Sequence, residues 1–519
     1  MQGHGQLDLL ALPAQELASG PPAAGVGPAA FVNPSPERVY VGTLLLRDYL
    51  ESSGMMEVIR LRELLFASDL SGFTSAYSPG GRRALHPGLM LGLIFFGIME
   101  GKWSLRELER LARFDVRAWW LCGGVQPDHS TIGNFLNRFQ AVLTEDYFSR
   151  LTRDLVRRLG IVAGEASADG TVLEAFSSRF RAIKLEAAEA ALQEAEQALA
   201  ANPHDSSLAE KRQAAQTAAA TLGSRVGKSA SRGKKASQRI CPGEPEAVLQ
   251  PLKNKTFRPS YKPSALANSE RLILGKDVRP SDENGSLAVM LEEHRAIVGA
   301  LPGRLLLDAG YQSLGVLSMC VDLELDVLCP SGSGAGNQWE RRSRKGEYGK
   351  SHFVYDEEKD VYICPAGKVL GREGKEKKLS GLENVAYACS DWRECGHHRE
   401  CTKRKSCRRI RRYGSDVYKE AMSKVFENAR ARETYGRRQS EVEPVFSELR
   451  GVQKLVRFHR IGLKGAKLEW SLHCSAYNLR RTLRLEARAA LCCIFVRTRD
   501  GIRILRATIV ILITGAARE

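Results

Sequence analysis

The spacing of apolar residues along the chain alternates between helical and strand-like patterns. Between residues 40 and 139, bulky apolar side chains recur every three or four positions, which predicts several short helices joined by tight turns. Ser104 and Ser130 stand where two of these helices would begin, and a serine there can cap free backbone N–H groups. The segment therefore predicts a small helical domain.

A different pattern follows residue 160. Short apolar runs lead to Asp169 and Asp308, and further strand-like and helical runs alternate as far as residue 330. Such alternation predicts an α/β layer with some parallel pairing. Each aspartate stands where a strand would run into a loop, with a glycine close behind it. The loops at the carboxyl ends of parallel strands are where α/β sheets place their functional groups.

Two inserted segments interrupt this layer. Within residues 185–240, an Ala-, Glu- and Gln-rich stretch predicts two helices broken at Asn202 and Pro203. The Lys-, Arg-, Gly- and Ser-rich stretch that follows has two interpretations, a phosphate-binding segment or a solvated linker. Residues 331–420 form a second, basic insertion that contains five cysteines. Beyond it, residues 421–485 return to a helical pattern.

The two ends of the chain differ in composition from the rest. Residues 1–38 are rich in Gly, Ala and Pro, which predicts a disordered arm. Residues 486–519 are apolar, and we expect an added strand pair or a read-through tail there, with no functional account. The longest apolar runs are shorter than the roughly 20 residues that cross a bilayer, so we expect no membrane span. The first residues do not resemble a secretory signal, which favours a cytoplasmic protein.

The charge of the chain indicates an anionic partner. Lys and Arg number 77 against 60 Asp and Glu, a net charge of +17, and nucleic acid is the partner that this favours. In the helical domain, arginines recur at three- or four-residue spacing, which fits either a DNA-binding face of helix-turn-helix type or a solvated face: Arg106, Arg110, Arg113 and Arg117. The twelve cysteines fit reduced thiols or metal binding better than a disulfide scaffold.

Three acidic residues are candidates for chemistry: Asp169, Asp308 and Glu443. They are so far apart in sequence that only folding can bring them together. Carboxylates suit hard cations such as Mg²⁺, and two ions roughly 4 Å apart can activate an attacking oxygen and neutralise a leaving one. This is the chemistry of phosphodiester cleavage. Glu441 and Glu448 are rival acids, ranked lower because neither has a basic residue seven positions later.

The segment around Glu443 predicts an amphipathic helix. Arg450 lies seven residues after Glu443 and so on nearly the same face, where it could hold a DNA phosphate. Pro444 disfavours a regular helix at this point. The apolar stripe of the segment is Val442, Val445, Phe446, Leu449, Val452 and Val456.

The cysteines of the second insertion have two interpretations. Four of them could hold a tetrahedral structural Zn²⁺: Cys364, Cys389, Cys395 and Cys401. The two-residue gap of strong zinc motifs is missing, however. The alternative is a set of reduced cysteines in a basic loop.

Three segments stand out together: ASADGT with Asp169, LLLDAGYQS with Asp308, and YGRRQSEVEPVFSELRG with Glu443. They resemble the RNase H-like DDE transposases of bacterial insertion sequences. The helical segment that begins LHPGLMLGLIFFGIMEG resembles the N-terminal domain of the same group, so the resemblance covers most of residues 55–482.

The resemblance implies roles for individual residues. In that family two aspartates and a glutamate bind two catalytic ions, Mg²⁺ or Mn²⁺, which would fall to Asp169, Asp308 and Glu443. A tyrosine, arginine, glutamate and lysine signature surrounds the last acid. Here Tyr435 and Arg438 fill the first two places and Arg450 stands where lysine is usual, as contacts to DNA phosphates. One extra residue separates Arg438 from Glu443 compared with the commonest form.

The resemblance also implies an architecture: an α/β protein with an RNase H-like mixed-sheet core, a helical N-terminal DNA-binding domain and inserted subdomains. The DNA-binding domain would be residues 39–150, the first part of the core 151–330, and the final catalytic helix region 421–485. The implied protein is bacterial and nucleoid-associated, and a homodimer or larger assembly on DNA.

The implied activity is that of a transposase. Such an enzyme recognises the terminal repeats of its element, cleaves a strand to expose a 3′ hydroxyl, and joins it to target DNA. Two alternatives remain: a DNA-binding descendant that no longer cuts, and a metal-dependent nuclease that does not join. The presence of all three acids argues against the first, and a requirement for specific DNA ends would distinguish the second.

Overall fold

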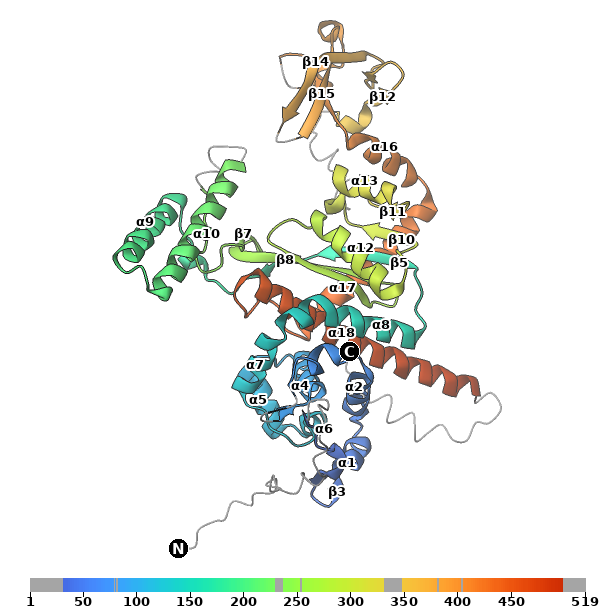
Figure 1. Ribbon diagram of the computed structural model, residues 1–519. Coiled ribbons are helices and arrows are strands. Elements are labelled where there is room, and N and C mark those ends of the chain that lie inside the picture. Colours follow the sequence, from blue (N-terminus) through green and yellow to red (C-terminus); the bar gives the residue numbers. More distant parts are fainter. Residues whose placement is uncertain are drawn as a thin grey trace. The chain divides into compact units, whose positions relative to one another are not determined.

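The computed structural model describes residues 31–78, 80, 83–228, 237–252, 254–330, 348–379, 382–402 and 405–497. Most of the predicted N-terminal arm, the centre of the basic linker, the start of the second insertion and the end of the apolar tail lie outside these residues. The chain forms two compact units (Figure 1). Among the described residues, the helical unit contains those within 31–161, 449–454 and 471–497, and the sheet unit contains those within 162–448 and 455–470.

The helical unit is built from short helices, as the apolar spacing predicted. They are α1 (Leu46–Ser52), α2 (Met56–Ala67), α3 (Ser71–Thr74), α4 (Pro87–Met99), α5 (Leu105–Phe114), α6 (Val116–Cys122), α7 (His129–Arg138), the π-helix η2 (Val142–Asp146) and α8 (Tyr147–Leu159). Every residue of α4 is buried, so this helix is central to the core. Two small strand pairs, β1 (Phe31–Val32) with β4 (Ala84–Leu85) and β2 (Tyr40–Val41) with β3 (Leu44–Leu45), complete the unit.

Helix starts in this unit follow capping chemistry. Ser104 caps α5 in a capping box with Glu107, as predicted. The prediction that Ser130 caps the next helix is wrong, because α7 already begins at His129. Asp128 has the extended backbone of a cap, and its carboxylate accepts a hydrogen bond from the Thr131 N–H.

The sheet unit contains a mixed seven-stranded sheet. Its strands are β5 (Glu165–Gly170), β6 (Leu173–Glu174), β7 (Val248–Pro251), β8 (Phe257–Asn268), β9 (Ile273–Arg279), β10 (Arg304–Leu307) and β11 (Asp326–Leu328). β10 pairs in parallel with β5 and β11, and β8 pairs antiparallel with β5 and β9. α12 (Asn284–Val298) joins β9 to β10, and α13 (Leu314–Asp322), capped by Ser313, joins β10 to β11. This α/β arrangement is consistent with the expected RNase H-like core.

The core of this sheet lies between the strands and these two helices. Ala166 and Leu305 from neighbouring strands are fully buried against Leu287 and Met290 of α12 and Val316 of α13. Because parallel strands need a crossover connection, the helices cover the sheet where those connections run.

Two insertions extend the sheet unit. The first is a helical hairpin of α9 (Leu185–Ala201) and α10 (Ser206–Lys228), broken at Asn202 and Pro203 as predicted. The second is an antiparallel sheet in the order β12 (Val354–Asp356), β13 (Val361–Ile363), β14 (Val369–Leu379), β15 (Leu382–Cys389) and β16 (Arg409–Tyr413). Two short segments, η6 (Trp392–Glu394) and α15 (His398–Cys401), lie between its last two strands.

Three helices follow the second insertion: α16 (Asp416–Val425), α17 (Ala429–Gly451) and α18 (Gly462–Arg497). Residues 486–497 belong to the end of α18, so for them the expectation of a strand pair is wrong. In the described part of the chain, no helix is long and apolar enough to cross a membrane.

Candidate active site

The two predicted aspartates lie on neighbouring parallel strands. Leu307 of β10 is paired with Ala168 of β5, so the next residues, Asp308 and Asp169, follow at the same edge of the sheet. Neighbouring strands are about 4.8 Å apart, which places the two carboxylates close together although 138 residues separate them in sequence. The register, and not the sequence distance, creates this pair.

Each aspartate is oriented by the backbone that follows it. Asp169 Oδ1 accepts a hydrogen bond from the Gly170 N–H at 2.9 Å, and Asp308 Oδ1 accepts one from the Ala309 N–H at 2.7 Å. Burial raises the pKa of Asp169, and the negative charges of Asp308 and Glu283 add to this effect. The positive charge of Arg438 opposes it. The site thus concentrates negative charge in partly buried surroundings, a property of functional sites.

Glu283 is an acid at this site that the sequence analysis missed. A Cβ added to Gly170 would lie 2.9 Å from its Oε2, and one added to Gly310 would lie 2.7 Å from its Oε1. The carboxylate therefore lies between the loops that follow the two aspartates, where it pairs with Lys262 at 3.0 Å. The glycines behind both aspartates were the available signal, because they allow this close approach.

Two residues of α17 face the aspartates. Arg438 Nη2 lies 3.2 Å from Asp169 Oδ1 and donates a hydrogen bond to the Ala168 carbonyl. Burial raises the pKa of Tyr435 to about 12, with the charges of Asp308 and Asp169 adding to the rise and that of Arg438 opposing it. Tyr435 and Arg438, three residues apart, thus present one face of the helix to the site.

The predicted third acid, Glu443, lies on the same helix, which continues through Pro444. Its side chain is exposed, and its Oε2 accepts a hydrogen bond from Gln439 Nε2 at 3.2 Å. Val442 is fully buried and stands four residues after Arg438 and seven after Tyr435, so it continues the face of the helix that those two residues use. Because one extra residue precedes Glu443, Val442 occupies the position on this face that the acid has at the commonest spacing.

The rival acids differ in their surroundings. Glu441 is buried, accepts a hydrogen bond from Ser167 Oγ on β5, and has a pKa raised by burial and by nearby Glu165. Glu448 is half-buried. Within the described residues, no three His, Cys, Asp or Glu side chains are arranged so that they could hold a metal ion. The structure therefore brings Asp169 and Asp308 together, and the third ligand stays a prediction.

The apolar stripe of this segment is shorter than predicted. Leu449 is buried, as are the three stripe residues before it, but Val452 and Val456 are 41% and 61% exposed. The reason is that α17 ends at Gly451, so the helical period no longer applies beyond it. Arg450 lies in the last turn of the helix.

Comparison with protein families matches two parts of the chain. Residues 363–483 match a family described as "Transposase DDE domain", and residues 55–138 match a "Transposase domain (DUF772)". The two matches fall in the order that the resemblance implied. Together these matches support a DDE transposase of insertion-sequence type. A comparison with curated proteins finds no match to this transposase.

The matched regions include some of the predicted site residues of the transposase. Tyr435, Arg438, Glu443 and Arg450 lie within the DDE match, and so do the cysteines of the second insertion. Asp169 and Asp308 lie outside both matches, so their case depends on the strand register and on the contacts described above.

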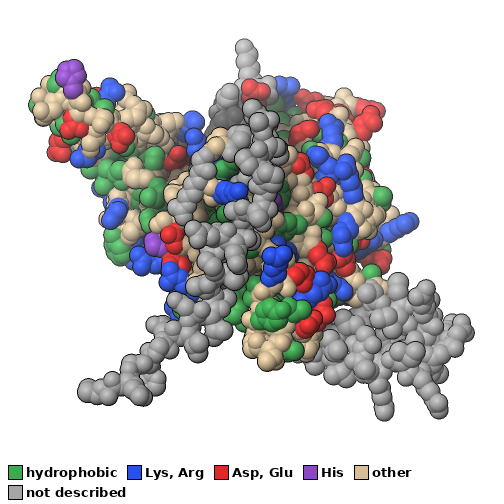
Figure 2. Space-filling view, turned by 60° about the horizontal axis from the view of Figure 1, so that its bottom comes forward, with side chains coloured by type: hydrophobic (Ala, Val, Ile, Leu, Met, Phe, Trp, Pro, Cys, Tyr) green, Lys and Arg blue, Asp and Glu red, His purple; other side chains and the backbone are tan. Residues whose placement is uncertain are grey.

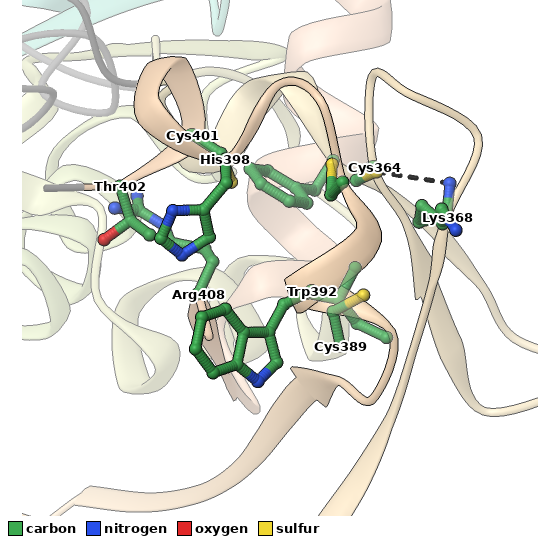
Figure 3. A pocket seen from close by; sticks show the side chains of 11 residues that line it. Cys364, Lys368, Cys389, Trp392, His398, Cys401, Thr402 and Arg408 are labelled. Carbon is green, nitrogen blue, oxygen red and sulfur yellow. Dashed lines mark hydrogen bonds between the residues drawn. The ribbon is translucent and has the colours of Figure 1, made fainter. Parts of the chain in front are cut away.

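The four candidate zinc cysteines of the transposase lie around one pocket of the second insertion (Figure 3). Cys364 follows β13, Cys389 ends β15, Cys395 follows η6 and Cys401 ends α15. Cys364 and Cys389 come from the strands, and Cys395 and Cys401 come from the connection between β15 and β16, so the fold of the insertion brings them to one pocket.

The arginines proposed for the DNA-binding face of the transposase are not equivalent. Arg117 pairs with Asp115 and Glu100 at 2.8 and 3.0 Å, and Arg113 pairs with Glu109 at 2.6 Å. Arg106 and Arg110 are exposed on α5. These two remain the better candidates for a contact with DNA, because their charges can reach a phosphate from solvent.

The surface charge of the transposase is mixed. On the face drawn in Figure 2, Lys and Arg side chains lie among Asp and Glu side chains and do not form one continuous patch. The described part of this face therefore does not present the positive charge of the chain as one patch.

Proposed function

We propose that this transposase binds the ends of its element, cleaves phosphodiester bonds there and joins the exposed 3′ hydroxyl to target DNA by transesterification. The observation that carries the proposal is the pairing of Asp169 and Asp308 at one edge of adjacent parallel strands, with Arg438 of α17 beside them. Oxygen ligands at a sheet edge beside a fixed cation suit the handling of a phosphodiester.

The donor set fits a hard divalent cation. Asp169, Asp308 and Glu443 would hold two Mg²⁺ or Mn²⁺ ions, which when bound activate an attacking oxygen and stabilise a leaving one. Arg438 keeps one oxygen of Asp169 in a defined position, and the Ala309 N–H does the same for Asp308. The exposed carboxylate of Glu443 must reach the aspartates from α17 when metal and DNA are bound.

Tyrosine and arginine side chains of this protein would bind the DNA. Tyr435, Arg438 and Arg450 contact phosphates near the cleaved bond, and Arg106 and Arg110 of α5 add sequence-independent attraction. The enzyme acts on DNA in the bacterial cytoplasm as a homodimer or larger assembly, because two element ends have to be processed together.

The decisive experiment is cleavage of a labelled duplex that carries the element's own end sequence. We expect cleavage that requires Mg²⁺ or Mn²⁺, and joined products when target DNA is added. Asp308→Asn should abolish both. Asp326→Asn is the matched control, because Asp326 starts the adjacent strand β11 at the opposite edge of the sheet, next to Arg304.

The outcomes separate the alternatives. Cleavage without joining would indicate a nuclease, and binding without cleavage by the native chain would indicate a DNA-binding descendant. Equal cleavage by native protein and Asp308→Asn would contradict the proposed site.

A second series tests the third acid. Glu443→Gln should remove cleavage while leaving the thermal unfolding midpoint unchanged, since the side chain is exposed. Glu441→Gln should leave cleavage within a few-fold of native. The reverse result would move the third ligand to the buried Glu441.

A further inference from the structure

The second insertion contains a pocket with an unusual lining. Cys364, Cys389, Cys395 and Cys401 line it, together with His398 (Figure 3). All four cysteines are free thiols, and each is partly exposed, unlike the buried cysteines of the two cores. The four thiols come from four separate points of the chain, and apolar packing alone could be supplied as well by Val or Leu.

The turn at Cys364 directs backbone N–H groups to its sulfur. Cys364 N–H donates to the Lys368 carbonyl at 2.9 Å and Gly367 N–H donates to the Cys364 carbonyl at 2.9 Å, with Gly367 at a φ of +70°. This tight turn lets the Lys368 N–H donate to Cys364 Sγ at 3.2 Å. The hydrogen bond fixes the position of the Cys364 sulfur at the edge of the pocket.

The same feature occurs at the second cysteine. The backbone N–H of Asp391 donates to the sulfur of Cys389, two residues earlier. Leu370, directly beyond the Cys364 turn, is paired with Cys389 in the sheet, so the two turns face one pocket. Arg408 also lines the pocket. Its positive charge offsets part of the charge of a thiolate cluster.

The described residues of the insertion enclose only a small apolar core. Its apolar cluster has five buried residues: Phe353, Tyr362, Leu370, Tyr387 and Ile410. Small folds with so little buried apolar area usually need a disulfide or a structural metal. Three of the cysteines, Cys364, Cys389 and Cys401, pack directly against this cluster.

We propose that Cys364, Cys389, Cys395 and Cys401 bind one structural Zn²⁺ that holds the loop between β15 and β16 against the sheet. The thiols, which among the described residues are not yet arranged as a metal site, turn toward a common centre when the ion binds. The short two-residue gap of common zinc motifs is unnecessary here, because the sheet supplies the convergence.

The test uses the full chain, purified under reducing conditions without chelator. We expect about one zinc per chain by elemental analysis, and replacement by Co²⁺ should give the intense near-ultraviolet and visible absorption of tetrahedral thiolate coordination. Cys401→Ser should lower the zinc content severalfold. Cys407→Ser should retain it, because Cys407 lies in the same insertion but not in the pocket.

Measurements on the native chain test the proposal even if the variants fail to fold. A zinc content near zero, or a Co²⁺ spectrum without thiolate bands, would overturn the proposal. So would a loss of free thiols in denaturant under non-reducing conditions, which would indicate disulfides. Removal of zinc by a strong chelator should expose the segment between β15 and β16 to limited proteolysis, with the helical unit unaffected.

Discussion

Arg438 is in direct contact with Asp169, one of the paired aspartates. Its side chain is 12% exposed and lies 3.2 Å from Asp169, whereas its neighbour Arg437 is 59% exposed and lies 3.7 Å from Glu165. A charge-assisted contact of low exposure contributes more than a solvent-screened one. Adjacent residues of the same type therefore have different expected importance.

We predict that Arg438→Ala lowers cleavage of the element end by about 10- to 100-fold, the effect of losing a hydrogen bond to a charged group of roughly 1.5–3 kcal/mol. Arg437→Ala should stay within about threefold of native, since exposed pairs contribute little. Cleavage rates at fixed DNA concentration give the comparison. Equal losses in both variants would show that general phosphate attraction, not the contact with Asp169, is responsible.

Glu469 is a buried acid that is not one of the candidate site residues. It is 2% exposed, and both of its oxygens accept a hydrogen bond from the His459 N–H. Burial raises its pKa to about 8, with nearby Glu244 adding to the rise and the N–H groups of His459 and Arg460 opposing it. The folded protein therefore holds a proton that the unfolded chain releases near pH 4.5.

This difference predicts a dependence of stability on pH. The stabilising effect of the retained proton is complete below about pH 4.5, falls as pH rises toward about 8, and changes no further above that value. Glu469→Gln, which stays neutral, should be more resistant to urea than the native chain at pH 8 and similar at pH 5. Glu427→Gln, on an exposed position, is the control and should follow the native chain. The prediction would be contradicted if the native chain became more stable to urea between pH 5 and 8 and Glu469→Gln showed the same pH dependence.

At the scale of elements, α17 tolerates a proline because another segment replaces the missing hydrogen bond. Pro444 has no N–H for the Ser440 carbonyl, which would otherwise be its helical partner. Arg271 Nε, from the turn between β8 and β9, donates to that carbonyl at 3.0 Å. The helix that carries the site is thus attached to the sheet at its weakest point.

A double-mutant cycle tests this attachment. Arg271→Ala should lower the free energy of unfolding by about 1 kcal/mol, and by less in a Pro444→Ala background, where the new N–H can serve the Ser440 carbonyl. Arg295→Ala, which removes only an exposed pair with Glu292 at 3.5 Å, should have little effect. Strictly additive effects of the first two substitutions would exclude the compensation.

At the scale of the whole molecule, the net charge of +17 should control DNA affinity. We predict that the logarithm of the binding constant falls linearly with the logarithm of salt concentration, because phosphate contacts release counterions. Arg110→Ala should reduce the slope by about one. Arg47→Ala should leave it unchanged, since Arg47 already pairs with Glu51 and Glu37. Equal slopes for native protein and Arg110→Ala would indicate that α5 does not contact DNA phosphates.

Much of this architecture follows from local sequence. The order of strands and helices, the hairpin break at Asn202 and the positions of Asp169 and Asp308 at strand ends were predictable, because periodicity, proline and glycine act over a few residues. The sequence was also sufficient to recognise the family, since its motifs are contiguous.

Tertiary structure alone decided the rest. The place of Glu283 between two loops, the exposure of Glu443 against the burial of Glu441, and the meeting of four cysteines depend on residues distant in sequence. Strand register and the rotation of α17 over the sheet set these positions, and neither is determined by local periodicity. For the same reason the sequence indicated Asp169 and Asp308 but not Glu283, and only the fold determined which acids lie together.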